Sequence, residues 1–213
     1  MVSSAQKPVP LDEARVLDAA FAVLEAEGFG GLTIRRIADE LGVKNPALYW
    51  HFRNKQEIVN GMAGRLLDRM VEAPLTAETW RGWLGGAARW YRKTLLSVRD
   101  GAEILSNANL SGSRHFADFQ RGIAFLRAQG FGERDALVGM VTIFDYALGV
   151  TYEHQADARL VDNTAPVTPI FAPLGSLMRD AARDALFEGG LELILDGLAL
   201  KHRVIAKPTG SLP

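Results

Sequence analysis

Apolar residues recur at helical spacing along almost the whole chain, and this periodicity limits the possible folds more than any other feature. In the first segment they include Ala14, Leu17, Phe21 and Leu24, which places them on one side of a helix. The alternation of apolar and polar residues that is typical of a half-buried strand is sustained nowhere. The sequence therefore predicts an all-α protein.

Turn-forming residues separate the predicted helices. We expect helices from Leu11 to the "EGFGG" segment, over 33–41, from an Asn45 cap with Pro46 in the first helical position, and over 55–71, 79–97, 101–108, 113–129, 133–155, 172–184 and 187–204. Thr33 is the expected cap of the second helix. Residues 1–10 are predicted to be a flexible arm, and the stretch "ADARLVDNTAPVTPIFAP", with three prolines, predicts a flexible loop over 156–172.

Composition excludes several classes of protein. The chain has no cysteine, so disulfides and thiolate metal sites are excluded, and a cytoplasmic location is expected. The first residues lack the apolar core of a signal peptide, and no run of 18 apolar residues predicts a membrane span. A net charge of −1 over 213 residues argues against indiscriminate coating of nucleic acid, although it can hide a local basic patch.

The segment "TIRRIADELGVKNPALYWHF", residues 33–52, has the spacing of a helix-turn-helix. Such a motif needs a small residue where its helices touch and a glycine at the turn, and Ala38 and Gly42 supply them. The residues expected to form the small core between the helices are Ile37, Leu41, Val43 and Leu48. Over 33–55, five Lys or Arg residues face two Asp or Glu residues, giving a local net charge of +3. The alternative is a helical hairpin in a core with solvated charges, but the agreement of turn, cap and charge favours DNA binding.

Four ring-bearing residues, Tyr49 to Phe52, follow in a row and cannot all face one core. Tyr49 and His51 are expected to face DNA, Phe52 to pack into the head, and Trp50 to be partly exposed. Asn45 can bind a base edge or cap the helix. The other candidates have chemistry suited to thymine methyl groups, guanine or phosphates, and they are Arg35, Pro46, Ala47 and Lys55.

The segment "GLTIRRIADELGVKNPALYWHFRNKQEIV" closely resembles the DNA-binding region of the tetracycline repressor (TetR) family of bacterial transcription regulators. Further along, "LLSVRDGAEI", "FLRAQGF" and "EGGLELILDGL" resemble parts of the family's C-terminal domain. The resemblance implies a DNA-binding domain over 11–55 and an effector-binding and dimerisation domain over 56–213, with 55–71 as the connecting helix. The implied DNA-contacting residues are Arg35, Lys44, Asn45, Pro46, Ala47, Tyr49, His51 and Lys55. Asn45 stands where the family's namesake has glutamine, so a different operator sequence is expected.

The resemblance also implies a homodimer that binds a palindromic operator and is released by a small molecule. The apolar helices 133–155 and 187–204 contain small residues that permit close approach, although they could also form a monomer's core. The predicted interface residues are Leu137, Met140, Val141, Phe144, Leu191, Ile194, Leu195 and Leu198.

A drug-sized pocket is mainly apolar with a few polar groups, so the aromatic residues between 80 and 152 are candidates for its wall. The predicted effector-binding residues are Trp83, Ala87, Trp90, Tyr91, Leu105, Asn109, Phe119, Gly122, Phe144 and Glu153. Glu153, His154, Asn107, Asn109 and His115 are the candidate polar contacts, with solvent-facing or capping roles as their alternative.

The resemblance further implies that tetracycline with magnesium is not the effector. The family's namesake holds that drug with polar side chains and a metal-binding histidine, whereas the matching positions here are Val71, Ala87, Leu105, Ala108 and Gly122. Apolar walls cannot pair with a ligand rich in hydroxyls and amides. We therefore expect an apolar aromatic effector and neither a metal nor a cofactor, with a tetracycline-responsive repressor as the alternative.

An enzyme is the rival class. The four histidines are scattered, and neither a nucleophile elbow nor a phosphate-binding glycine loop is found, so catalysis is not expected. A transcription activator or a regulator without an effector remains an alternative that the sequence does not separate from a repressor.

Overall fold

The computed structural model describes residues 10–71, 77–111, 113–159 and 180–205. Within these ranges every regular element is an α-helix and no strand occurs, so the predicted all-α class is confirmed. The helices are α1 (Glu13–Gly31), α2 (Ile34–Leu41), α3 (Asn45–Leu48), α4 (Lys55–Val71), α5 (Trp80–Leu96), α6 (Gly101–Ser106), α7 (Arg114–Ala128), α8 (Glu133–Arg159) and α10 (Asp180–Ile205). No described helix is long and apolar enough to cross a membrane.

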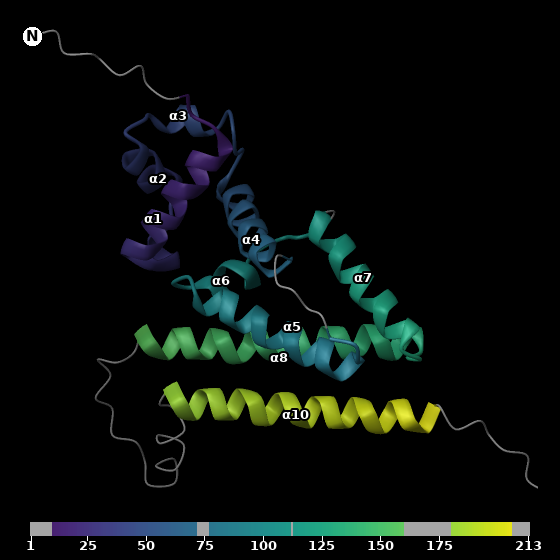
Figure 1. Cartoon of the computed structure of the whole chain (residues 1–213). Coiled ribbons are helices and arrows are strands. Elements are labelled where there is room, and N and C mark those ends of the chain that lie inside the picture. The colour runs from purple at the N-terminus through teal and green to yellow at the C-terminus, as the bar shows by residue number, and fades with distance from the viewer. Residues whose placement is uncertain (1–9, 72–76, 112, 160–179, 206–213) are drawn as a thin grey trace, which may run out of the picture.

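Helices α1, α2 and α3 form a head at one end of the molecule (Figure 1). The N-terminus of α1 is capped by Asp12, whose carboxylate accepts a hydrogen bond of 2.8 Å from the backbone N–H of Arg15. Thr33 caps α2 as predicted, because its hydroxyl accepts the backbone N–H of Arg36 at 3.2 Å. Gly42 ends α2 in the left-handed region, with φ 65°, which a residue without Cβ adopts at little cost.

Helix α3 differs from its prediction. Its N-cap is Lys44 rather than Asn45, and no side chain caps it, because Asn45 already has helical backbone geometry. The helix ends at Leu48, and the turn continues as the backbone N–H groups of His51 and Phe52 both donate to the carbonyl of Leu48 at 2.9 Å. The four ring-bearing residues therefore lie on a tight turn after the helix.

Helix α4 leads from the head to a larger bundle in which α8 and α10 run side by side in opposite directions (Figure 1). Helix α10 is continuous from Asp180, although two helices broken near residue 185 were predicted. Gly190 is a packing position rather than a turn, because a Cβ there would lie 2.0 Å from the Tyr146 hydroxyl. That hydroxyl donates to the carbonyls of Leu186 and Phe187 at 3.1 Å.

Two predicted mobile segments fall mainly outside the described residues. Positions 1–9 of the expected arm and 160–172 of the expected loop are not described, nor is the predicted start of the last helix at 172–179. The first residues of the expected loop are helical, because α8 continues to Arg159.

Candidate functional site

The head has a compact apolar interior beneath α2 and α3. Ile37, Ala38 and Leu48 have no exposed surface, and Leu41 and Val43 pack against them while partly exposed. Phe52 is also buried and joins this cluster, in agreement with its predicted packing role. Burial of these side chains fixes α3 against α2 and directs its remaining side chains outward.

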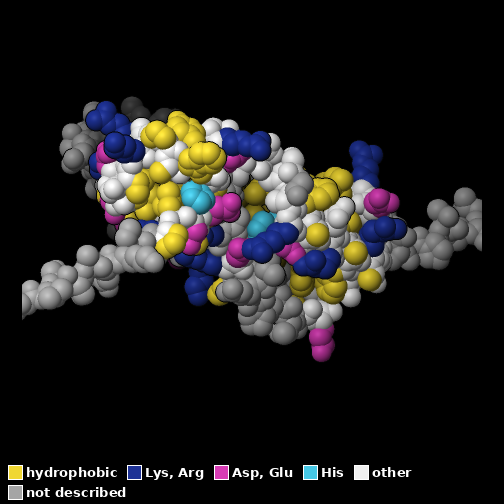
Figure 2. Space-filling view, turned by 90° about the horizontal axis from the view of Figure 1, so that it is seen from above, with side chains coloured by type: hydrophobic (Ala, Val, Ile, Leu, Met, Phe, Trp, Pro, Cys, Tyr) yellow, Lys and Arg dark blue, Asp and Glu magenta, His cyan; other side chains and the backbone are white. Residues whose placement is uncertain are grey.

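The outward side of the head carries the predicted DNA-contacting residues. Tyr49 is 52% exposed and Trp50 is 87% exposed, which is more than the partial exposure expected for Trp50. Of the other predicted contacts, Arg35, Lys44, Asn45 and Pro46 are exposed, whereas Ala47, His51 and Lys55 are partly exposed. Figure 2 looks onto this end of the molecule and shows Lys and Arg side chains around a hydrophobic patch. The surface thus combines positive charge with exposed rings.

Two basic side chains near this surface contact other parts of the head. Arg36 forms an ion pair with Glu27 of α1, and this interaction lowers the pKa of the Glu27 carboxyl. The ammonium group of Lys55 lies 4.8 Å from the centre of the Phe29 ring, a cation–π distance. Arg35, one residue before Arg36, is on the exposed side of α2.

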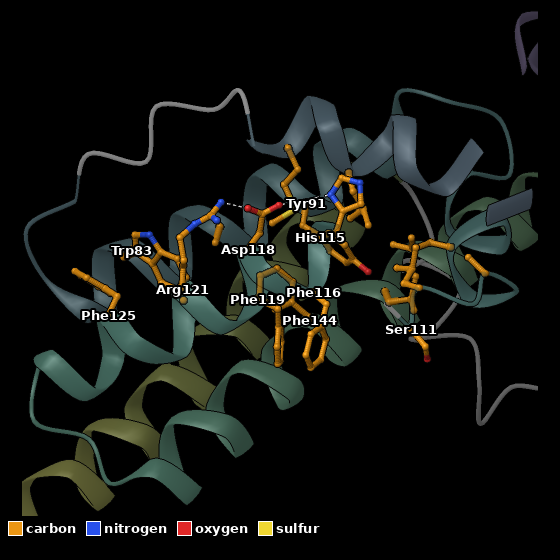
Figure 3. A pocket seen from close by; sticks show the side chains of 18 of the residues that line it. Trp83, Tyr91, Ser111, His115, Phe116, Asp118, Phe119, Arg121, Phe125 and Phe144 are labelled. Atoms are coloured by element: carbon orange, nitrogen blue, oxygen red, sulfur yellow. Dashed lines mark hydrogen bonds and ion pairs between the residues drawn. The ribbon is translucent and has the colours of Figure 1, made fainter. Parts of the chain in front are cut away.

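A cavity of about 1120 Å³ lies among α4, α5, α6, α7 and α8, below the head. Its wall is mainly aromatic and aliphatic (Figure 3). Eight of the ten predicted effector residues line it, namely Trp83, Ala87, Tyr91, Leu105, Asn109, Phe119, Gly122 and Phe144. These eight residues therefore line one continuous space, and their role in effector binding stays a prediction.

The structure places the other two predicted effector residues outside the cavity wall. The indole N–H of Trp90 donates to the carbonyl of Arg69 at 3.2 Å, so Trp90 joins α5 to the end of α4. Glu153 is exposed on α8. Asn107 and His154, two of the suggested polar contacts, also lie outside the wall, because His154 faces Arg92 at 3.3 Å and Asn107 caps α6.

Tyr91 is buried in the cavity wall, where its ring meets that of Phe144 edge to face with centroids 5.1 Å apart. Burial, with a smaller contribution from Asp145, raises the pKa of the Tyr91 hydroxyl above its usual value. The hydroxyl is therefore protonated at neutral pH and supplies a hydrogen-bond donor.

A row of polar side chains on α7 was largely missed by the sequence prediction. His115, Asp118 and Arg121 line one wall of the cavity in succession, and Arg121 forms an ion pair with Asp118 (Figure 3). Their spacing of three residues places them on one helix face. Nε2 of His115 also lies 3.4 Å from Oδ1 of Asp68 on α4, and no pattern in the sequence near His115 predicts this contact. Burial is the main cause that lowers the pKa of His115, and it outweighs the opposing effect of Asp68.

A hydrogen-bond network connects α4 to the loop between α6 and α7. The Gln56 amide donates to the Asn107 carbonyl at 2.7 Å and to the Asn60 side chain at 3.0 Å. Asn60 in turn accepts the backbone N–H of Asn109 at 2.8 Å. Because Asn109 lines the cavity, this network joins the cavity wall to the helix that leads into the head.

Helices α8 and α10 expose apolar side chains away from the interior. On α10, Leu186, Leu193 and Leu200 are 46%, 75% and 67% exposed and seven residues apart, and we call them the apolar stripe. Leu137 and Val141, both predicted interface residues, are also exposed.

The other predicted interface residues do not lie on this outer surface. Met140, Leu191, Leu195 and Leu198 are buried within the chain itself, Phe144 lines the cavity, and Ile194 is partly buried. Most of the predicted interface residues thus lie on the inner faces of α8 and α10, because inner and outer faces are both apolar and periodicity alone does not distinguish them.

Comparison with known proteins agrees with this architecture. Residues 16–62 match the family "Bacterial regulatory proteins, tetR family", and residues 73–202 match "Tetracyclin repressor-like, C-terminal domain". The tetracycline repressor protein class A from transposon 1721 of Escherichia coli is 36% identical, over 92% of this chain and 94% of the relative. Among solved structures, TetR(class A) in complex with 5a,6-anhydrotetracycline and magnesium is 34% identical, with a TM-score of 0.71 over 89% of this chain and 98% of that one.

A third relative was solved on DNA. BioQ with its double-stranded DNA operator is 30% identical, with a TM-score of 0.69 over 89% of this chain and 99% of that one. The first family match contains the helix-turn-helix, and the second contains most of the residues that line the cavity. The chain therefore belongs to the TetR family of bacterial transcription regulators.

Proposed function

We propose that this regulator is a repressor that binds a palindromic DNA operator as a homodimer and leaves it when an aromatic effector enters the cavity. The observation that supports this most directly is the juxtaposition of a basic, ring-bearing head with a large apolar cavity, joined by α4. In this proposal the effector is bound and released unchanged, without a catalytic step. Such a regulator acts on DNA in the bacterial cytoplasm.

DNA contact is assigned to the exposed residues of α2, α3 and the turn that follows. Major-groove recognition begins at the N-terminal residues of the second helix, where Lys44, Asn45 and Pro46 are exposed. Tyr49 and His51 follow on the turn and can hydrogen-bond phosphates or bases. Arg35 supplies a positive charge on the exposed side of α2. The solved complex of BioQ with its operator supports this use of the head.

Substituting Tyr49 tests the DNA assignment. Tyr49→Ala is expected to weaken operator binding about tenfold, which corresponds to the loss of about 1–2 kcal/mol from one contact. Because the side chain is 52% exposed, the thermal midpoint should change little. The measurement is a gel shift with DNA from upstream of the protein's own gene. Tyr49→Phe separates the hydroxyl from the ring, and wild-type affinity in Tyr49→Ala would contradict the assignment.

Homodimerisation is assigned to the outer faces of α8 and α10. The apolar stripe is too regular to be scattered surface leucines, because its members repeat every seven residues along one helix face. The inner face of α10 is buried in the chain, and Arg81 and Arg89 of α5 form ion pairs with Glu192 on another side. The stripe is therefore the side of α10 left for a partner copy, together with Leu137 and Val141 of α8.

The effector assignment follows from the chemistry of the cavity wall. Ala87, Leu105 and Gly122 offer no polar side-chain atom, and a leucine cannot coordinate a metal. The complex of TetR(class A) contains magnesium and 5a,6-anhydrotetracycline. In this chain the residues do not fit a metal held at Leu105, and among the described residues no group of three or more His, Cys, Asp or Glu could hold one. An apolar aromatic molecule suits the wall better.

A ligand panel tests this effector class. We expect apolar multi-ring aromatics to raise the thermal midpoint and to release operator DNA, because burial of their surface in the cavity stabilises the folded state. Tetracycline with magnesium should have a smaller effect. Thermal shift and gel shift measured on the same panel check both effects. Stabilisation by tetracycline with magnesium alone would favour the tetracycline-responsive alternative, and release by no ligand would favour an effector-independent regulator.

Coupling between cavity and head is assigned to α4. The network from Gln56 through Asn60 to Asn109 links the loop beside the cavity to α4 by hydrogen bonds. An effector that contacts the loop changes this arrangement and shifts the spacing of the two heads in the dimer. The effector must bind the DNA-free arrangement more tightly for release to occur.

A further inference from the structure

We propose that His115 selects the effector by pairing with a phenolic hydroxyl on an otherwise apolar, multi-ring aromatic molecule. This inference rests on the proposed function, because it takes the cavity to be the effector site. It adds the functional group that the effector presents and the residue that recognises this group.

The ring of His115 lies between two carboxylates. Its side chain is 9% exposed, with Nε2 3.4 Å from Asp68 Oδ1 on α4 and Nδ1 3.6 Å from Asp118 Oδ2 on α7. Among the described residues, Nδ1 has no hydrogen-bond partner. The distance to Asp118 is too long for a hydrogen bond. A buried polar atom in the wall of the cavity is therefore unsatisfied.

The protonation chemistry of imidazole explains why the chain itself leaves this atom unsatisfied. Neutral imidazole has one N–H, so only one ring nitrogen can donate toward the carboxylate that it faces. The other nitrogen then directs a lone pair at a carboxylate oxygen, which has no proton to give. A doubly protonated ring would direct an N–H at each carboxylate, but burial lowers the pKa of His115, and this effect outweighs the opposing effect of Asp68. The missing element is a hydrogen-bond donor between His115 and Asp118.

The charges around the ring favour a neutral donor. Asp68 is paired with Arg114, and Asp118 is paired with Arg121, so the cluster is balanced when His115 is neutral. The arginine side chains are 73% and 69% exposed, whereas the carboxylates are 35% and 27% exposed. An ammonium group would bring an uncompensated positive charge into a largely apolar space. A phenolic hydroxyl supplies a proton without that charge.

The shape of the cavity suits such a molecule. Figure 3 shows His115, Asp118 and Arg121 along one wall, with Phe119 and Phe144 lying apart from them. Flat rings can pack against these phenylalanines while a hydroxyl at the ring edge reaches the polar row. Because His115 also faces Asp68 of α4, the ligand hydroxyl changes a contact of the helix that leads to the head.

Three fluorescent probes of one shape test the proposal. Pyrene has no polar group, 1-hydroxypyrene adds a phenolic hydroxyl, and 1-pyrenemethylamine adds an ammonium. Titrating full-length protein into each probe should give 1-hydroxypyrene about tenfold tighter binding than pyrene, as expected for a hydroxyl that satisfies a buried site. His115→Leu should bind the two equally, and His115→Gln, which keeps an amide in the wall, should retain part of the preference. Gln120→Ala, exposed on α7, should keep all of it.

The outcomes separate this inference from the proposed function. Equal affinity for pyrene and 1-hydroxypyrene in the wild type, or an unchanged preference in His115→Leu, would overturn the role of His115. Tightest binding of 1-pyrenemethylamine would overturn it in favour of a cation site at Asp118. Gly122 lines the cavity, and a Cβ there would lie 2.7 Å from atoms of Trp83 and Met140, so the ring in Gly122→Phe displaces wall side chains and takes up space that a ligand needs. Failure of pyrene to bind, or equal binding by Gly122→Phe, would instead overturn the effector site and with it the inference.

Discussion

Leu193→Glu is expected to leave the protein monomeric and to weaken operator binding by about a hundredfold or more, because two linked heads bind a palindrome far more tightly than one. Leu193 is the most exposed member of the apolar stripe, at 75%. In a symmetric dimer a glutamate there would be buried against the partner's apolar surface, and burial of an unpaired carboxylate is costly. Size-exclusion chromatography with light scattering measures the oligomeric state, and a gel shift measures the affinity.

A matched variant shows that the effect depends on position. Ala124→Glu adds the same charge on α7 at an exposed residue outside the stripe, and it should leave both the dimer and operator binding intact. Helical content measured by circular dichroism should be unchanged in both variants, because neither side chain belongs to the core. A Leu193→Glu protein that remains dimeric would exclude the stripe as the interface.

The head was predictable from sequence because its determinants are local. Thr33, Ala38 and Gly42 lie within ten residues of one another, and neighbouring residues in the sequence determine the role of each. Thr33 caps α2, Ala38 is the small buried residue, and Gly42 ends the helix in the left-handed conformation. The length of α3 was not predictable in the same way. The carbonyl of Leu48 accepts the backbone N–H groups of both His51 and Phe52, and Phe52 is buried at the end of this turn. Where the helix ends thus depends on packing that the local sequence does not reveal.

The aromatic part of the cavity was also predictable, whereas its polar wall was not. Rings at helical spacing indicate which faces of α5 and α7 point inward. The environment of His115 depends on Asp68, which is 47 residues earlier on another helix. The spacing of His115, Asp118 and Arg121 was the available signal, but the same spacing is common on solvated helix faces. Only the tertiary contact with Asp68 distinguishes a cavity wall from a solvated helix face.

Two glycines have different structural roles, one at the end of a helix and one inside a helix. Gly42 ends a helix, as its position after an apolar periodic segment predicted. Gly190 sits inside α10, where the Tyr146 hydroxyl occupies the space that a side chain would need. A sequence pattern cannot distinguish a helix end from a packing position, because the residue that makes the difference is on α8.

Asp100→Ala is expected to lower the free energy of unfolding by about 2–3 kcal/mol, because Asp100 joins the head to the cavity domain and has an unusual backbone conformation. Its carboxylate accepts a hydrogen bond of 2.7 Å from the backbone N–H of Phe29, near the end of α1, and the residue is only 3% exposed. Alanine would leave that N–H without its acceptor. Asp100 also has φ 54°, in the left-handed region, which aspartate tolerates better than alanine.

Asp100→Asn distinguishes the loss of the acceptor and of the left-handed backbone conformation from a general disturbance of the contact between the head and the cavity domain, which we call the joint. Asparagine keeps an acceptor oxygen and tolerates the left-handed conformation, so it should cost about 1 kcal/mol, the difference between a charged and a neutral hydrogen bond. Urea denaturation at one fixed protein concentration measures both variants, since the stability of a dimer depends on concentration. The Arg99 guanidinium donates to the Glu25 carbonyl at 2.6 Å beside this contact and holds the joint in the asparagine variant. Equal losses in the two variants would show that the carboxylate charge, rather than the acceptor or the backbone conformation, stabilises the joint.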